Sequence, residues 1–137
     1  MTPFHLAFPV ADLKATRAFY IEKLGCEAGR ESPGAWLDFD FFGHQLSAHL
    51  RKTSGPSMGN VDGDAVPIPH FGAVLDMERF NTLAARLEQA ADTDWILKPK
   101  TRMKGEPGEQ ATMFVRDPSG NCIEFKGFAD QDALFAT

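Results

Sequence analysis

Residues 5–13, HLAFPVADL, have a counterpart in residues 70–76, HFGAVLD. Each stretch begins with a histidine, continues as a short apolar run and reaches an aspartate. A short apolar run predicts a strand, and an aspartate before a helical pattern predicts a helix N-terminus. The same transition from strand to helix therefore occurs twice, which predicts an internal repeat.

The first repeat continues outward from this stretch as a helix and three further strands. The helix begins after Asp12 and ends at Gly25, because aspartate caps helix N-termini and glycine ends helices. The remaining elements are a short edge strand over 27–30, a turn at 32–34, and two strands over 35–42 and 44–50 that are joined at Gly43.

The second repeat has the same order of elements. A strand over 69–75 leads to Asp76, which precedes a helix with apolar positions at Phe80, Leu83, Ala84 and Leu87. Strands are then predicted over 94–97, 110–116 and 121–128, with a Pro/Gly/Lys-rich loop over 99–108 and a turn over 117–120. Gly43 and Gly120 hold equivalent turn positions in the two repeats.

The predicted fold class is α+β, with two βαβββ modules that form one domain over residues 1–137. Module one covers about 1–50, a Gly/Pro/Ser-rich connector covers 51–68, module two covers about 69–128, and the tail 129–137 has no assigned structure. One module alone is too small to bury a face of its sheet well. We therefore expect the two modules to form a curved eight-stranded mixed sheet around a metal-binding cleft.

Composition narrows the classes of partner. The chain has 137 residues, of which 43% are apolar and 24% charged, a balance typical of globular proteins. It has no apolar run of the about 18 residues that span a membrane, and no visible signal peptide. The net charge is −5 without a basic stripe, which disfavours nucleic acid. We expect a cytoplasmic protein in which Cys26 and Cys122 are reduced thiols.

Four residues are candidates for a metal site. His5 and His70 open the two repeats, while Glu124 and His49 follow the turn glycines by four and six residues. Side chains alternate along a strand, so both of these offsets place a side chain on the same face. Two imidazoles and one carboxylate suit Fe(II), and also Zn, Mn, Ni or Co. A single histidine on a strand is more often an ordinary polar residue, so the prediction depends on the repeated placement.

Three further polar residues could bind a substrate. Gln45 shares the predicted face of His49, and Gln110 and Thr112 share one face of a later strand. The alternative is that they are ordinary polar residues on a sheet surface. His44 points away from His49 and is interpreted as structural.

The residues at both ends of the chain resemble a known family. The opening, HLAFPVADL followed by RAFY (17–20) and Leu24-Gly25, and the closing FVRDPSGNCIEF (114–125) resemble motifs of the vicinal oxygen chelate superfamily of glyoxalases, bleomycin resistance proteins and extradiol dioxygenases. The resemblance covers nearly the whole chain. It implies a divalent metal ion on the inner faces of the sheets, with His5, His70 and Glu124 as ligands.

The resemblance leaves the reaction open. His49 lies where glyoxalases place a fourth ligand, and in the region where extradiol dioxygenases carry an acid/base histidine. The expected function is an extradiol-dioxygenase-like enzyme with Fe(II), acting on a small substrate with two adjacent oxygens. The alternatives are a glyoxalase-type isomerase or lyase with Zn, Ni or Mn, and a protein that binds a small ligand without turnover. The ring-cleaving enzymes usually have a tyrosine near the metal, and Tyr20 is the only tyrosine here.

The resemblance also implies an assembly. Family members form homodimers, and their modules pair either within one chain or across the dimer. We therefore expect a homodimer with either arrangement.

Overall fold

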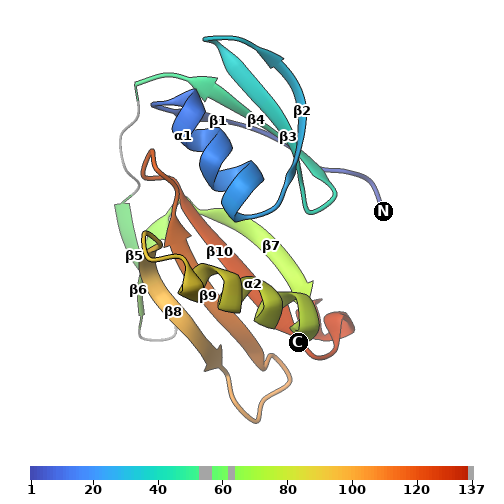
Figure 1. Ribbon diagram of the computed structural model, residues 1–137. Coiled ribbons are helices and arrows are strands. Elements are labelled where there is room, and N and C mark those ends of the chain that lie inside the picture. The colour runs from blue at the N-terminus through green and yellow to red at the C-terminus, as the bar shows by residue number, and fades with distance from the viewer. Residues whose placement is uncertain (53–56, 62–63, 136–137) are drawn as a thin grey trace. The chain divides into compact units, whose positions relative to one another are not determined.

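A computed structural model describes residues 1–52, 57–61 and 64–135. The chain is α+β and divides into two compact units, shown in Figure 1. Unit 1 comprises Met1–Gly55 and Asp117–Asn121, and unit 2 comprises Pro56–Arg116 and Cys122–Thr137. The helices of the described residues are all too short or too polar to cross a membrane.

Unit 1 contains a four-stranded mixed sheet and one helical segment. Its strands are β1 (His5–Val10), β2 (Glu27–Ser32), β3 (Trp36–Phe41) and β4 (His44–Leu50), in the order β1-β4-β3-β2. Strand β1 runs parallel to β4, and the other pairs are antiparallel. Between β1 and β2 lies α1 (Leu13–Arg17), which continues as the π-helical turn η1 (Ala18–Lys23). Asp12 caps α1 as predicted, because its Oδ1 accepts a hydrogen bond from the Ala15 amide at 2.8 Å.

Unit 2 repeats this topology. Its elements are β7 (Phe71–Asp76), α2 (Met77–Gln89), β8 (Asp94–Arg102), β9 (Gln110–Arg116) and β10 (Cys122–Phe128), with the sheet order β7-β10-β9-β8. Strand β7 is parallel to β10. Both modules therefore have the same βαβββ order and the same sheet order, which confirms the predicted internal repeat and fold class.

Each sheet has one face covered by its helix. In unit 1 the Tyr20 ring of η1 lies 4.6 Å from the ring of Phe39 on β3. In unit 2 a Cβ added to Gly127 of β10 would lie 2.8 Å from Met77 and Phe80 of α2, so this helix packs directly on the strand. Side chains alternate along strands, so the neighbouring residues of each strand lie on the opposite, helix-free face. The candidate site residues lie on these helix-free faces.

Three segments differ from the prediction. The connector 51–68 contains an antiparallel pair, β5 (Ser57–Val61) and β6 (Asp64–Ile68), and the tail contains the short 3₁₀ helix η2 (Gln131–Phe135). Strand β8 continues to Arg102, beyond the predicted end at Leu97. It continues through Pro99 because the register shifts between Leu97 and Lys100, where a residue without an amide proton disturbs no ladder hydrogen bond. Residues 53–56 and 62–63 of the connector and 136–137 of the tail lie outside the described residues.

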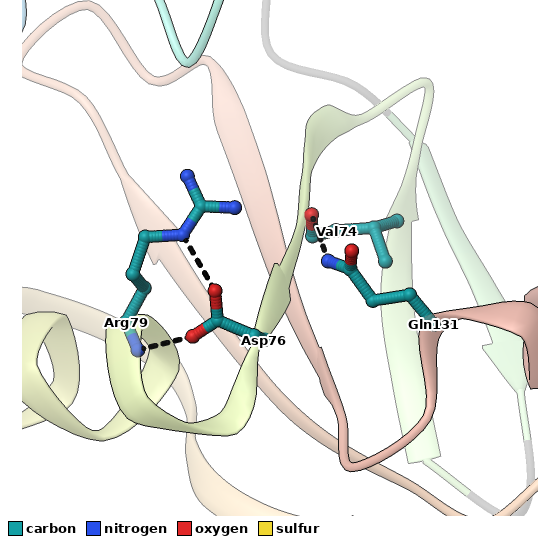
Figure 2. Close-up of polar contacts among 4 residues, drawn as sticks. All are labelled: Val74, Asp76, Arg79 and Gln131. Atoms are coloured by element: carbon teal, nitrogen blue, oxygen red, sulfur yellow. Dashed lines mark hydrogen bonds and ion pairs between the residues drawn. The ribbon is translucent and has the colours of Figure 1, made fainter.

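Polar contacts hold the C-terminal end and the middle of the edge strand β7 (Figure 2). At its C-terminal end, Asp76 caps α2 by accepting the Arg79 amide at 2.8 Å and pairs with the Arg79 guanidinium at 3.0 Å. The backbone hydrogen bond from Arg79, and then the Arg79 side chain, lower the pKa of the Asp76 carboxyl. On the strand itself, Gln131 donates to the Val74 carbonyl at 3.5 Å.

The turn between β9 and β10 belongs to unit 1 although both strands belong to unit 2. Its Asp117 is 4% exposed and accepts a hydrogen bond from the Tyr20 hydroxyl at 2.8 Å. The same carboxylate accepts the backbone amides of Ser119 and Asn121. Asn121 in turn donates to the Pro9 carbonyl at 2.9 Å. The only tyrosine of the chain is thus fully buried in this network.

Candidate metal centre

The structure brings His70 and Glu124 together in unit 2. His70 directly precedes β7, and Glu124 lies in the middle of β10, where it pairs in register with Gly72. The imidazole Nε2 lies 3.1 Å from Oε2 of the carboxylate, and the two side chains are 21% and 12% exposed. Two of the three predicted metal ligands are therefore neighbours.

The other imidazole nitrogen fixes the tautomer of His70. Its Nδ1 lies 2.6 Å from the Pro67 carbonyl oxygen, which only accepts hydrogen bonds, so Nδ1 carries the proton. The lone pair of Nε2 then faces a carboxylate oxygen. A cation held by both atoms would relieve the repulsion between the two lone pairs. A backbone carbonyl that accepts from the far nitrogen is typical of a metal-ligating histidine, so the pair fits a divalent ion.

Thr112 orients the carboxylate of Glu124. Its hydroxyl donates to Oε1 at 2.8 Å, which leaves Oε2 directed at His70. Thr112 is fully buried on β9. The sequence predicted a substrate-binding role for Thr112, whereas its hydroxyl hydrogen-bonds to the candidate ligand.

Gly72 allows β7 to approach β10 at the candidate site. A Cβ at this position would overlap the backbone oxygen of Glu124. A hollow of about 270 Å³ lies along β7 and is lined by residues that include His70, Val74, Glu124 and Lys126. The candidate ligands therefore border a space large enough for a small molecule.

His5 and His49 share the helix-free face of unit 1, as predicted. His5 pairs in register with Gln45, and Pro9 pairs with His49. The two histidines are thus four residues apart along the parallel strands, about 13 Å at the usual rise per residue. Within the described residues neither imidazole has a side-chain hydrogen bond.

Gln45 lies beside a second hollow, of about 400 Å³, in unit 1. Its amide donates to Asp38 at 3.2 Å, and Asp38 also accepts from the Ser47 hydroxyl at 2.5 Å. His44 lines the same hollow, where its Nδ1 accepts the Phe4 amide at 2.7 Å. That hydrogen bond agrees with the structural role predicted for His44.

The repeat relates the two helix-free faces residue by residue. Counting from the turn glycines Gly43 and Gly120, Glu124 corresponds to Ser47, and His49 corresponds to Lys126. The position of unit 1 that is equivalent to Glu124 therefore holds a serine, which is not one of the usual imidazole, thiolate or carboxylate ligands of these metals. Sequence reasoning missed Lys126, although its position two residues after Glu124 puts it on the same face.

Two other observations define the extent of the site. Gln110 donates to the Gly108 carbonyl at 3.2 Å and pairs in register with Arg102, at the far end of β9 from the turn. In the described part of the chain no group of three or more His, Cys, Asp or Glu side chains is close enough to hold a metal ion. The structure thus assembles the pair His70 and Glu124, and places His5 and His49 together on the other sheet.

Comparison with known proteins identifies similar chains. The family model described as the Glyoxalase/Bleomycin resistance protein/Dioxygenase superfamily matches residues 2–125. None of the curated proteins matches the chain. Among solved structures, a glyoxalase/bleomycin resistance protein/dioxygenase from Alicyclobacillus acidocaldarius has 34% sequence identity and a TM-score of 0.80, and the match covers 98% of this chain and 96% of that one.

Two further solved structures share the fold at lower identity. A lactoylglutathione lyase from Agrobacterium tumefaciens is 19% identical with a TM-score of 0.65, over 99% of this chain and 97% of that one. A fosfomycin resistance protein, FosX, from Listeria monocytogenes is 14% identical with a TM-score of 0.70, over 97% of both chains.

Proposed function

Because the chain belongs to the glyoxalase/bleomycin resistance protein/dioxygenase superfamily, we propose that it is a metal-dependent enzyme that binds a small substrate through two adjacent oxygen atoms. His70 and Glu124, together with His5, would hold the ion. The observation that carries this proposal is the 3.1 Å pair of His70 Nε2 and Glu124 Oε2, with the Nδ1 proton fixed by Pro67.

The chain's own residues prepare this site in three ways. The Pro67 carbonyl orients the His70 imidazole, and the Thr112 hydroxyl orients the Glu124 carboxylate. Phe114 packs edge-on against His70 at 5.0 Å between ring centres and limits water on one side of the imidazole. A divalent ion held by two imidazoles and one carboxylate keeps open positions and a net positive charge, so it would polarise the two substrate oxygens.

His49 is proposed to transfer a proton to or from the substrate. The about 13 Å of strand between His5 and His49 is too long for both imidazoles to reach one ion, because strand side chains stand nearly perpendicular to the sheet and metal–nitrogen bonds are about 2.0–2.1 Å. Imidazole as a side-chain type takes up and releases protons near neutral pH. We therefore assign His49 to proton transfer rather than to a fourth ligand position.

Two reaction types follow from different observations. Two imidazoles and one carboxylate form the ligand set of the non-haem Fe(II) oxygenases, which favours extradiol-dioxygenase-like chemistry. The burial of Tyr20 against Asp117 favours the second candidate, a glyoxalase-type isomerase or lyase, because no tyrosine is then available beside the metal.

Elemental analysis of protein purified anaerobically, without added metal or chelator, tests the proposal. We expect about one divalent ion per chain, and we expect Glu124→Gln to lose it because the amide cannot supply the charged ligand. Glu88→Gln, at an exposed position on α2, is the matched control and should retain the metal. A Glu124→Gln protein that holds metal as well as the parent would show that the site is assigned wrongly.

Activity assays then separate the two reaction types. Iron in the purified protein and oxygen uptake with catechol would support the dioxygenase. Zinc, nickel or manganese, with formation of lactoylglutathione from methylglyoxal and glutathione, would support the isomerase or lyase.

A further inference from the structure

Lys126 lies in the candidate site, beside the carboxylate of Glu124. It follows Glu124 by two residues on β10, on the helix-free face, and it lines the same hollow as His70 and Glu124. Its side chain is partly buried. Among the residues that the structure describes, none forms an ion pair or hydrogen bond with its ammonium group. An ammonium group that no described acceptor contacts is available to bind a negatively charged group in the hollow.

Two more cations lie on the same face. Thr112 pairs in register with Lys126 on one side and with Lys100 on the other, so the three residues form a row across β10, β9 and β8. Arg102, which is 3% exposed, lies two residues beyond Lys100. The Glu124 carboxylate lies on the same face of β10, two residues before Lys126. Of the three cations, only Lys126 lines the hollow.

We propose that Lys126 binds an anionic group of the substrate, a carboxylate or a phosphate-type oxyanion. This inference rests on the proposed function, since it takes the two adjacent oxygens to bind at the ion held by His70 and Glu124. It narrows the substrate class to small anions that carry two adjacent oxygens. It also assigns Lys126 to substrate recognition rather than to metal binding.

Calorimetric titration with two matched probes tests the proposal. Both 3,4-dihydroxybenzoate and 3,4-dihydroxybenzamide offer two adjacent oxygens, but only the benzoate has a negative charge. With zinc-loaded protein and oxygen excluded, we expect the benzoate to bind about tenfold more tightly, as one charge-assisted contact would give. Lys126→Met should abolish this preference without changing the metal content or the affinity for the amide.

A charge-matched control excludes a general effect of net charge. Lys14→Met removes an exposed lysine from α1, the helix on the sheet of unit 1. This variant should still bind the benzoate more tightly than the amide. Competition of the benzoate probe with inorganic phosphate and with benzoate then shows which oxyanion Lys126 prefers. Stronger competition by phosphate would identify a phosphate-type group, and stronger competition by benzoate a carboxylate.

The outcomes distinguish this inference from the proposed function. Equal affinity for both probes in a protein that holds one metal ion per chain would overturn the anion site and leave the metal site standing. A protein that binds no metal would overturn the proposed function. In that case, the melting temperatures of the metal-free parent and Lys126→Met proteins are measured with and without inorganic phosphate. A rise with phosphate in the parent alone would still support the anion site. An equal response of the two proteins would overturn it.

Discussion

The two oxygens of Glu124 have different partners, and this separates two functions within one side chain. Oε2 faces His70, while Oε1 accepts the hydroxyl of Thr112. Removal of the Glu124 carboxylate is therefore expected to abolish metal binding. Removal of the Thr112 hydroxyl should only make the orientation of that carboxylate less fixed.

Thr112→Val tests the orienting contact. Valine has a similar shape but cannot donate to Glu124, so we expect metal affinity to fall by about 10- to 100-fold, as is usual for partners of metal ligands. Competition with a chromogenic chelator measures this change. Thr101→Val, at an exposed position on β8, is the control, and an equal effect of both substitutions would contradict the role of Thr112.

Cys26 is predicted to be unreactive in the folded protein. Burial, and to a lesser extent the negative charge of Asp40, raises the pKa of its thiol from 9.0 to about 12. In a Cys122→Ala background, alkylation by iodoacetamide at pH 8 should therefore occur only as fast as the protein unfolds. Rapid alkylation of the folded protein would contradict this.

The same shift predicts a loss of stability in alkali. Above pH 9 the unfolded thiol releases its proton while the folded thiol keeps it, so the free energy of unfolding should fall as pH rises from 9 towards 12. Urea unfolding at several pH values measures this. The Cys26→Ala protein should lose less stability over that range than the parent.

Individual residues also show what a sequence can reveal about a site. Alternation along strands was sufficient to place Glu124 on one face and His5 with His49 on another. It could not reveal that the Pro67 carbonyl holds His70, because that contact comes from a segment whose sequence predicted only a connector. The fixed tautomer depends on a backbone atom, and backbone atoms carry no signature of residue type.

At the scale of elements, the close approach of β7 and β10 depends on one glycine. Any Cβ at position 72 would overlap the backbone of Glu124, so Gly72→Ala must push the strands apart. We expect it to lower the free energy of unfolding by about 2–4 kcal/mol, in the range of severe steric substitutions, and to weaken metal binding. Urea unfolding measures the first effect and elemental analysis the second.

Gly29 provides a comparison on the other sheet. A Cβ there would lie 3.2 Å from the Asp38 carbonyl oxygen, a gap that small shifts can relieve. Gly29→Ala should therefore cost less than about 1 kcal/mol, as a tolerated surface change does. Equal losses for the two variants would show that the tight packing at Gly72 is not special.

Local sequence signals predicted some elements better than others. The N-cap aspartates and the buried positions of α2 were predicted correctly because both depend on neighbouring residues alone. The extension of β8 was missed because Pro99 usually ends a strand, and only the register shift beside β9 makes it acceptable. Strands β5 and β6 were missed because a high content of Gly, Pro and Ser favours loops.

At the scale of the whole molecule, the two units do not follow the two halves of the sequence. Unit 1 requires Asp117–Asn121, which follows β9 of unit 2 in the chain. The repeat itself was predictable, because the motifs at 5–13 and 70–76 correspond. The assignment of residues 117–121 to unit 1 could not be predicted. Their sequence predicted only a turn, and nothing local indicates which sheet a turn contacts.

Tyr20→Phe tests the importance of this segment. The substitution removes the hydroxyl that donates to Asp117, a carboxylate that is only 4% exposed, so we expect a loss of about 1–2 kcal/mol in the free energy of unfolding. Ser119→Ala removes the exposed contact to the Ala11 amide and should cost less than about 0.5 kcal/mol. A larger effect of Ser119→Ala in urea unfolding would contradict the dominant role of Asp117.

The placement of Asp117–Asn121 also constrains how a gene for this fold can be divided. A cut at the boundary of the sequence repeat would produce a first polypeptide without the carboxylate for Tyr20 and without the amide for Pro9. That half would carry its own helix and four strands and still lack part of its interior. Recombination that exchanges one half of the chain must therefore also keep a compatible five-residue turn in the other half.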